Sequence, residues 1–304
     1  MAEVKISEPA EVNVKASKKL KTLDSYTTKS KILEGFSWLL LILYMTPFYL
    51  MFINSFKTRR EIFANTTGLP SAWNFKNYAD AMDRMGITSA FTNSIIITVG
   101  SVLLILLFSS MAAWVLVRDK STKSKIVFYI FTAGMIVPFQ AVMLPLVKWM
   151  GKINFGGFNM LGTHYGLMFM YLGFGASMSI FLYHGFIKGI PEEIEEAAII
   201  DGCTRWQVFT KVIIPLSKPI IVQTIVASFM APWMDFIFAR VIAGSEPQYY
   251  TVSVGLWNML TRENITNYYT RFAAGAVLVS IPIAILFCSV QKYYMEGNAG
   301  AVKG

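Results

Sequence analysis

Acidic side chains gather in one stretch of an otherwise apolar chain. They fall within residues 190–219 and comprise Glu192, Glu193, Glu195, Glu196 and Asp201. Carboxylates in the first turn of a helix are stabilised by the positive end of the helix dipole. The chain shows no nucleophile elbow, no glycine-rich phosphate loop and no zinc signature, so no catalytic residues and no metal site are expected. The chemistry that this stretch predicts is capping, ion pairing or docking to another surface.

The same stretch predicts two short helices joined by a tight turn. Pro191 can occupy the first helical position, where its missing N–H costs nothing. Gly202 can adopt a positive φ and predicts the end of that helix, and Thr204 is a suitable cap for the second. Pro215 and Pro219 then end the unit and open the next apolar run. The pattern alone fits an ordinary helical hairpin on a membrane surface as well as it fits a docking element.

A second group of polar side chains lies inside apolar runs. A carboxylate such as Asp235 costs about 2.5–3.5 kcal/mol at bilayer depth on insertion scales, so it should face a bundle interior or a wet cavity. It can line a solute path beside Trp233 as a stacking platform, or it and Arg240 can each bond a neighbouring helix. Gln140 follows Pro138, whose ring frees a backbone carbonyl, so its amide can bond a solute or satisfy the kink. These alternatives remain open from the sequence.

Composition places these residues in a membrane protein. Of 304 residues, 55% are hydrophobic and 15% are charged, whereas soluble domains carry about 25% charged residues. The net charge of +9 is spread over short loops and a tail, which fits lipid contact better than nucleic acid binding. Cys203 and Cys288 are not spaced as a disulfide framework or metal site. The first apolar run is too long and begins too late for a cleavable signal peptide.

Six apolar runs approach the roughly 20 residues that a membrane span requires. We predict an all-α membrane protein with a lysine-rich tail at residues 1–35, a membrane domain at 36–291 and a short tail at 292–304. Prolines interrupt the third and sixth runs. The predicted spans are 36–55, 91–117, 126–147, 165–187, 219–243 and 272–291.

Charge predicts the orientation of these spans. Six spans place both termini on one side, and that side holds 17 of the 27 lysines and arginines while the other holds 9, with Arg240 inside a span. Because an excess of these residues marks the cytoplasmic side, both termini and the acidic stretch are predicted to be cytoplasmic. Lys57, Arg59 and Arg60 crowd the opposite side and are the exception to this topology.

The order of residues within the acidic stretch resembles a known motif. Glu196-Ala197-Ala198 is followed by Asp201-Gly202, Phe209 and Ile214-Pro215, which resembles the EAA motif of bacterial ABC importer permeases. Cys203 stands where that family usually has alanine. The family resemblance extends over about residues 36–304.

Further segments are similar to the carbohydrate branch of these permeases. They are Asn54–Lys57, Pro138–Gln140 and Ala231–Phe236. The ending Gly300–Gly304 resembles the smaller permease of maltose-type importers. The resemblance implies the type I ABC importer permease fold, with six transmembrane helices and a cytoplasmic coupling helix within residues 190–215.

The resemblance also implies roles for individual residues. Coupling to an ATPase falls to the hairpin residues Glu195, Glu196, Ala197, Ala198, Asp201, Gly202, Cys203, Trp206, Phe209 and Pro215. The expected sugar path includes Gln140, Trp233 and Asp235. This chain is then no enzyme and holds no cofactor, because ATP and magnesium are bound by the partner ATPase.

The implied partners are those of a sugar importer in a bacterial inner membrane. They are a second, homologous permease, a dimer of ABC ATPases, an extracytoplasmic sugar-binding protein facing residues 244–269, and membrane lipid. The C-terminal tail would reach the interface between the ATPase subunits. The implied function is ATP-driven import of an oligosaccharide such as a maltodextrin. The alternatives are a permease for an amino acid or sugar phosphate, a polytopic membrane enzyme, or an ion channel.

Overall fold

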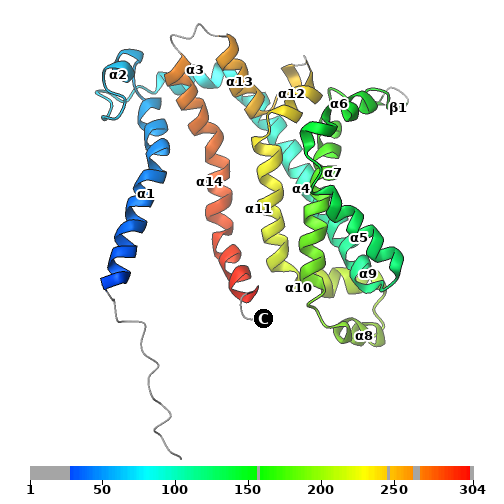
Figure 1. Ribbon diagram of the computed structural model, residues 1–304. Coiled ribbons are helices and arrows are strands. Elements are labelled where there is room, and N and C mark those ends of the chain that lie inside the picture. The colour runs from blue at the N-terminus through cyan, green and yellow to red at the C-terminus, as the bar shows by residue number, and fades with distance from the viewer. Residues whose placement is uncertain (1–27, 156–157, 245–246, 263–267, 302–304) are drawn as a thin grey trace, which may run out of the picture. The chain divides into compact units, whose positions relative to one another are not determined.

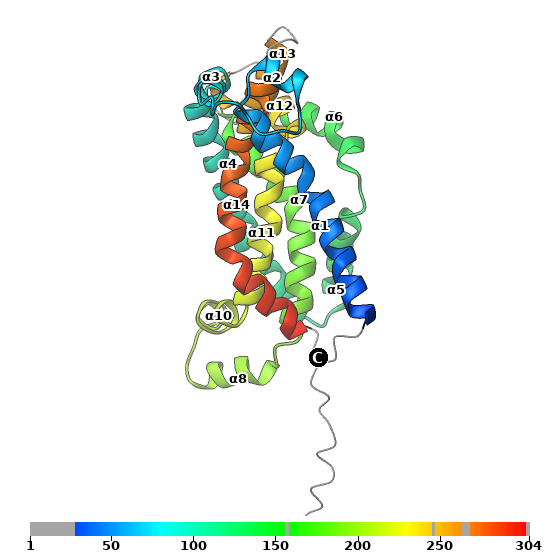
Figure 2. The same ribbon diagram turned by 90° about the vertical axis from the view of Figure 1, so that its left-hand side faces the viewer.

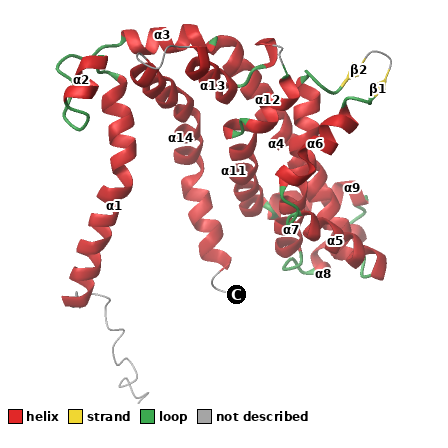
Figure 3. Ribbon diagram, turned by 45° about the horizontal axis from the view of Figure 1, so that its top comes forward, coloured by secondary structure: helices red, strands yellow, loops and turns green. Residues whose placement is uncertain are grey.

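The protein is built from helices. The computed structural model describes residues 28–155, 158–244, 247–262 and 268–301, and within these residues only one two-stranded hairpin, β1 (Asn154–Phe155) with β2 (Phe158–Asn159), departs from helix and loop (Figure 3). Most of the predicted N-terminal tail and the last three residues lie outside the described part. The chain divides into two compact units, residues 1–50 and 51–304, which are described separately.

The first unit consists of most of α1 (Thr28–Ser55). Residues 30–49 of this helix are exposed and largely apolar around the whole circumference. A helix that is apolar on all sides belongs in a membrane or a large core. The segment 30–55 is long and apolar enough to cross a membrane, which agrees with the first predicted span.

The second unit is organised around four long helices. They are α4 (Ile87–Arg118), α7 (His164–Ile187), α11 (Lys218–Met234) and α14 (Tyr268–Ala301). In this unit α4 packs against α7 and α11, and α11 packs against α14 (Figure 1). Small hydroxyl residues on α4, among them Thr98 and Ser101, are fully buried, and such residues let helices approach closely in a membrane.

Two of the six predicted spans are broken helices. The third is divided into α5 (Thr122–Gly134) and α6 (Phe139–Met150), because Pro138 disfavours helical geometry in the residue before it. The fifth is divided into α11 and α12 (Ile237–Ala243). Four of the described helices are long and apolar enough to cross a membrane. The prediction of an all-α multi-pass membrane protein is confirmed, but a set of six continuous helices is not.

The second unit has two different ends. One end, called the hairpin end, carries α8 (Glu192–Ile200), α9 (Arg205–Val208), the π-helical turn η2 (Phe209–Ile213) and α10 (Ile214–Leu216). The other, called the loop end, carries α2 (Arg59–Ala64), α3 (Lys76–Met85), α12, the 3-10 turn η3 (Pro247–Tyr249) and α13 (Val252–Arg262). The C-terminal end of α14 lies at the hairpin end (Figure 2).

One cation of the loop end, Lys57, is buried and hydrogen-bonded within the protein. The Lys57 side chain is only 1% exposed, and its Nζ donates to the carbonyl oxygens of Asn65 at 2.9 Å and Thr66 at 3.1 Å. Burial lowers the pKa of Lys57, while the charge of Glu61 acts in the opposite direction. Lys57 therefore sits at this end for a structural reason, although Arg59 and Arg60, the other exceptions to the charge rule, remain exposed.

Candidate functional site: a surface hairpin and a cavity

The first half of the surface hairpin, defined as residues 190–217, forms where the sequence predicts it. Pro191 is the residue before α8 rather than its first helical residue, a shift of one position. Gly202 has φ +88°, and the N–H of Cys203 donates to the carbonyl oxygen of Ala198 at 3.0 Å. The prediction that Gly202 ends the first helix is thus confirmed, since only glycine adopts this φ without strain.

The second half begins with the predicted cap and ends between the two predicted prolines. The Thr204 backbone N–H donates to the Gln207 side chain at 2.8 Å, and the Gln207 N–H donates back to the Thr204 hydroxyl at 3.3 Å. Pro215 and Pro219 flank the end of the unit, as predicted: α10 ends at Leu216, and Pro219 lies in the first turn of α11. The N–H of Ile214 donates to the carbonyl of Phe209, five residues back. This π-helical turn adds a residue to the helix, which continues past Pro215 and bends by 78° into α11.

The hairpin has an exposed face and a buried face. Ile200 is 85% exposed and Trp206 57% exposed, and they adjoin the exposed Glu196 and Asp201. Of the remaining residues predicted to act in coupling, Ala197, Gly202 and Pro215 are exposed, Ala198 and Cys203 are half-buried, and Glu195 and Phe209 are buried. An exposed apolar patch rimmed by polar groups is typical of a protein interaction site.

The buried face is held by a charged contact with the end of α4. Glu195 Oε1 accepts from Arg118 Nε at 2.7 Å, and Glu195 Oε2 accepts from Trp114 Nε1 at 3.0 Å. The side chains of Arg118 and Glu195 are 16% and 10% exposed.

Asp119, which caps α4, accepts from the Ser121 backbone N–H at 3.0 Å and from its hydroxyl at 2.8 Å. These bonds lower the pKa of the Asp119 carboxyl.

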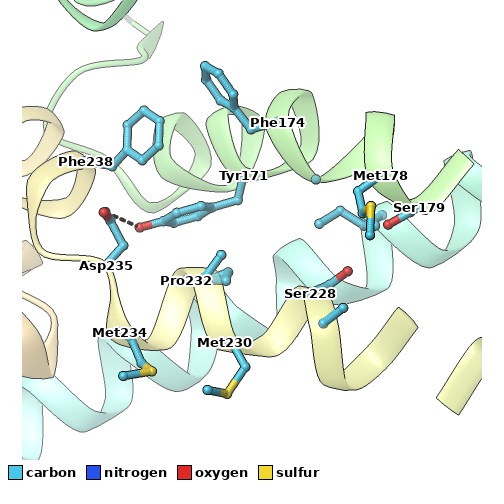
Figure 4. Close-up of a pocket in the computed structure, with 14 residues that line it drawn as sticks. Tyr171, Phe174, Met178, Ser179, Ser228, Met230, Pro232, Met234, Asp235 and Phe238 are labelled. Atoms are coloured by element: carbon cyan, nitrogen blue, oxygen red, sulfur yellow. Dashed lines mark hydrogen bonds between the residues drawn. The ribbon is translucent and has the colours of Figure 1, made fainter. Parts of the chain in front are cut away.

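A cavity of about 480 Å³ lies between α4, α7 and α11, beside the break before α12. Its wall is mostly apolar, and it includes the polar groups of Tyr171, Ser179, Ser228 and Asp235 (Figure 4). Three methionines, Met178, Met230 and Met234, also line it and are partly exposed. Flexible thioether side chains adapt to ligands of varied shape, so the wall suits a bulky solute with few fixed polar contacts.

Asp235 lies at the cavity and bonds to a neighbouring helix. Its Oδ2 accepts from the Tyr171 hydroxyl of α7 at 2.9 Å (Figure 4) and from the Ala239 backbone N–H at 3.2 Å. Arg240 instead donates to the carbonyl of Gly244 at 2.6 Å and to the Tyr250 hydroxyl at 3.1 Å. The structure therefore shows both features that the sequence left open, a polar group at the cavity and a bond between helices.

The comparisons identify the family to which this arrangement belongs. Residues 105–294 match the family described as binding-protein-dependent transport system inner membrane component. The chain belongs to this family. It is 38% identical to a probable starch degradation products transport system permease protein of Thermoanaerobacterium thermosulfurigenes, over 86% of this chain and 93% of that protein. It is 32% identical to the melibiose/raffinose/stachyose import permease of Bacillus subtilis, over 85% and 91%.

Solved structures agree on the fold. A chain of a bacterial ABC transporter involved in import of the acidic polysaccharide alginate matches with a TM-score of 0.72 and 22% identity, over 88% of this chain and 99% of that chain. A second structure, of a bacterial alginate transporter in complex with an alginate pentasaccharide-bound periplasmic protein, matches with a TM-score of 0.62 and 15% identity, over 85% and 90%. The predicted ABC importer permease fold is confirmed, and the family is one of transport components.

One residue predicted for the solute path, Trp233, does not lie beside Asp235 at the cavity. Trp233 is 1% exposed, its Nε1 donates to the Val279 carbonyl at 3.0 Å, and its ring packs against Phe229 at 5.5 Å between centroids. Trp233 does not line the cavity in this conformation. Gln140 lies in the first turn of α6, and its side chain is outside the described part.

Sequence reasoning missed the residues that hold the hairpin. Trp114 and Arg118 lie four positions apart at the end of an apolar run, which places them on one helix face. That spacing was the available signal. Their partner Glu195 is 77 positions beyond Arg118, and no local pattern indicates which carboxylate they bind.

Proposed function

We propose that this chain is a permease subunit of an ATP-driven importer and that its solute is a sugar, an oligosaccharide such as a maltodextrin. The relatives named for starch degradation products and for melibiose, raffinose and stachyose support a sugar, as does one named for arabinooligosaccharides. A cavity with a carboxylate, a phenol and two serine hydroxyls among apolar side chains offers hydrogen bonds and apolar contact to a sugar.

The surface hairpin is the observation that carries the proposal. The sequence holds no P-loop pattern for hydrolysing ATP, so an importer built on this chain depends on another subunit for energy. The exposed face at Glu196, Ala197, Ile200, Asp201 and Trp206 is the surface offered to an ABC ATPase dimer. Closure of that dimer on ATP would shift the permease between two states, one open to each side of the membrane.

The two ends of the second unit suit opposite sides of a membrane. Lysines and arginines of the hairpin end are mostly exposed, as at Lys125, Lys188 and Lys211, which is the charge excess expected of a cytoplasmic side. We therefore place both termini and the tails, residues 1–35 and 292–304, in the cytoplasm of a bacterium. The loop end would face an extracytoplasmic sugar-binding protein, and a second homologous permease would complete the solute path.

Purification and uptake together test this function. The tagged chain is expressed in its own host and extracted in mild detergent, and a P-loop ATPase and a second permease are expected to co-purify with it. A strain lacking the chain should lose uptake of labelled maltotriose and keep uptake of labelled amino acids. Retained maltotriose uptake with lost amino acid uptake would contradict the sugar, and recovery of no ATPase would contradict the importer.

A further inference from the structure

One acidic residue of α8 points away from the exposed face. Glu195 is buried at 8% exposure, while Glu193 and Glu196 on either side of it are exposed. A carboxylate in this position cannot dock to another protein without leaving its bonds. Its role therefore lies within this chain, although the resemblance places Glu195 among the residues that couple to an ATPase.

The Glu195 carboxylate is fully occupied by α4. Oε1 lies 2.7 Å from Arg118 Nε and 2.6 Å from Arg118 Nη2, and Oε2 accepts the Trp114 indole N–H. Arg118 Nη2 also donates to the Ile190 carbonyl oxygen at 3.0 Å, so one guanidinium fixes both α8 and the segment leading into it. Charge-assisted bonds of this kind are short and strongly directional.

Trp114 ties the second half of the hairpin to the same turn of α4. Its ring lies 5.4 Å from the Phe209 ring between centroids, and Phe209 is 2% exposed in a core with Ile187, Val208 and Ile213. The two halves of the hairpin therefore share one attachment. The end of α4 therefore contacts both α8 and η2 through Trp114.

The helix that receives this attachment reaches both of the other functional regions. Ile105 of α4 lines the cavity. At the loop end, the Asn93 side chain donates to the carbonyl oxygens of Gln248 at 2.7 Å and Tyr250 at 3.0 Å, and the Ser94 hydroxyl accepts the N–H of Val252 at 2.9 Å. From residue 93 to residue 118 a continuous helix spans about 38 Å.

We propose that Trp114, Arg118 and Glu195 form a rigid joint, called the hairpin joint, through which motion of the surface hairpin is carried into α4 and on to the cavity and the loop end. These three are positioning residues that contact neither ATP nor sugar. The proposal deepens the proposed function and rests on it, since it presumes an ATPase that moves the hairpin.

A second ion pair between the same two segments provides a matched control. Lys120 Nζ lies 3.1 Å from Glu192 Oε2, with side chains that are 76% and 44% exposed. An exposed pair is screened by water and holds little. Arg118→Gln and Lys120→Gln remove the same kind of charge two positions apart, but only the first breaks the hairpin joint.

The test measures whether ATP still changes the cavity. The whole complex of this chain, its second permease and its ATPase is reconstituted in liposomes with Met178→Cys in the cavity wall and Cys203→Ala and Cys288→Ser as background. The labelling rate of Cys introduced at position 178 by a thiol reagent is compared with and without ATP and magnesium. Glu195→Gln, Arg118→Gln, Arg118→Lys and Lys120→Gln are then added singly, and ATPase co-purification and ATP hydrolysis are measured alongside.

The hairpin joint predicts uncoupling without dissociation. Glu195→Gln and Arg118→Gln should keep the ATPase bound and hydrolysing while the ATP-dependent change in labelling falls by about tenfold, within the usual range of coupling between sites. Arg118→Lys retains the charge but not the forked geometry and should keep part of the response. Lys120→Gln should respond as the parent does.

Two results would overturn the joint. One is a parental response in Glu195→Gln and Arg118→Gln, and the other is loss of the ATPase from both, which would make Glu195 a docking or folding residue. If the parent complex itself contains no ATPase, the proposed function fails first and the joint with it.

Discussion

Glu195 and Asp235 are carboxylates that bond to neighbouring helices, and their surroundings differ. Glu195 at the hairpin end is paired with the Arg118 guanidinium and an indole N–H. Asp235 at the cavity is bonded by neutral donors, among them the Tyr171 hydroxyl and the Ala239 N–H. A buried carboxylate paired with a buried cation depends on that partner, because removing either one leaves an uncompensated charge. A carboxylate held by neutral donors can exchange them for the hydroxyls of a solute at lower cost.

From this contrast we expect the hairpin joint to keep its geometry and the cavity to rearrange. The hairpin joint keeps the geometry of an attachment, and the cavity lies at a helix break, where α11 ends and α12 begins. Variants of the two regions should therefore fail in different ways. Four sets of variants, ordered from the largest expected effect to the smallest, test this difference.

The turn of the hairpin should tolerate change least. Gly202→Pro cannot adopt φ +88°, since proline is fixed near −65°. The double variant Glu196→Lys with Ala198→Asp should reverse a charge on the exposed face and place a carboxylate where half-buried Ala198 packs against the core. Both should reduce sugar uptake to background while the chain still inserts in the membrane, measured by uptake and by membrane fractionation. Gly202→Asn, which tolerates positive φ better, should keep part of the uptake. Normal uptake by Gly202→Pro would rule out the hairpin as the driven element.

Loss of the Glu195 carboxylate should destabilise the protein strongly. Glu195→Ala leaves the half-buried Arg118 without its partner; breaking a fully buried pair costs about 3–5 kcal/mol, and the 16% exposure of Arg118 places the expected loss below that range. Thermal unfolding of the purified chain in detergent should show a clear fall in melting temperature. Glu196→Ala on the same helix is the control and should stay within about 0.5 kcal/mol, as exposed substitutions do. Equal falls in melting temperature for Glu195→Ala and Glu196→Ala would contradict a stabilising contact between Glu195 and Arg118.

The hydrogen bond between Tyr171 and Asp235 should contribute less to the free energy of unfolding than the contacts of the hairpin joint. Tyr171→Phe removes the hydroxyl that donates to Asp235 and should lower the free energy of unfolding by about 0.5–1.5 kcal/mol. Asp235→Asn keeps an acceptor for Tyr171 and should fold about as well as the parent. If Asp235 meets the solute, the Asn variant will still raise the KM for sugar uptake. A drop in stability as large as that of Glu195→Ala would remove the distinction between the two regions.

The exposed ion pair should matter least. Lys120→Gln breaks the contact with Glu192, and exposed pairs contribute about 0.2–1 kcal/mol. Its melting temperature and its sugar uptake should lie close to those of the parent. Added salt screens exposed charges and should reduce the remaining difference in melting temperature. An effect comparable to that of Arg118→Gln would show that the loop after α4, rather than the buried joint, holds the hairpin.

Local signals in the sequence were sufficient to predict the elements of the hairpin. Gly202 and Thr204 act on their immediate neighbours, so a glycine stop and a capping box can be read from residue types alone. The π-helical turn before Pro215 was not predicted, because it depends on how Phe209 packs into the core, which no local pattern specifies. The continuity of the fifth span was overestimated because Asp235 ends α11 by bonding beyond its own helix.

Contacts between distant segments could not be read from one sequence. Glu195 binds Trp114 and Arg118 across 81 and 77 positions, and Trp233 is buried because its N–H meets a carbonyl 46 positions later. A tryptophan in a span can equally face a solute or a neighbouring helix. Which one it does depends on the packing of α11 against α14, and that packing is fixed only in the folded chain.

Crosslinking from the exposed face of the hairpin tests the central claim most directly. A photoreactive amino acid replaces Ile200, which is 85% exposed, in cells expressing the full importer, and the adducts are identified by mass spectrometry. We predict an adduct with a P-loop ATPase that increases when ATP is trapped, and none when the same probe replaces the buried Ile213. An adduct with an extracytoplasmic protein, or labelling of this position by a reagent that cannot enter the cell, would contradict the account.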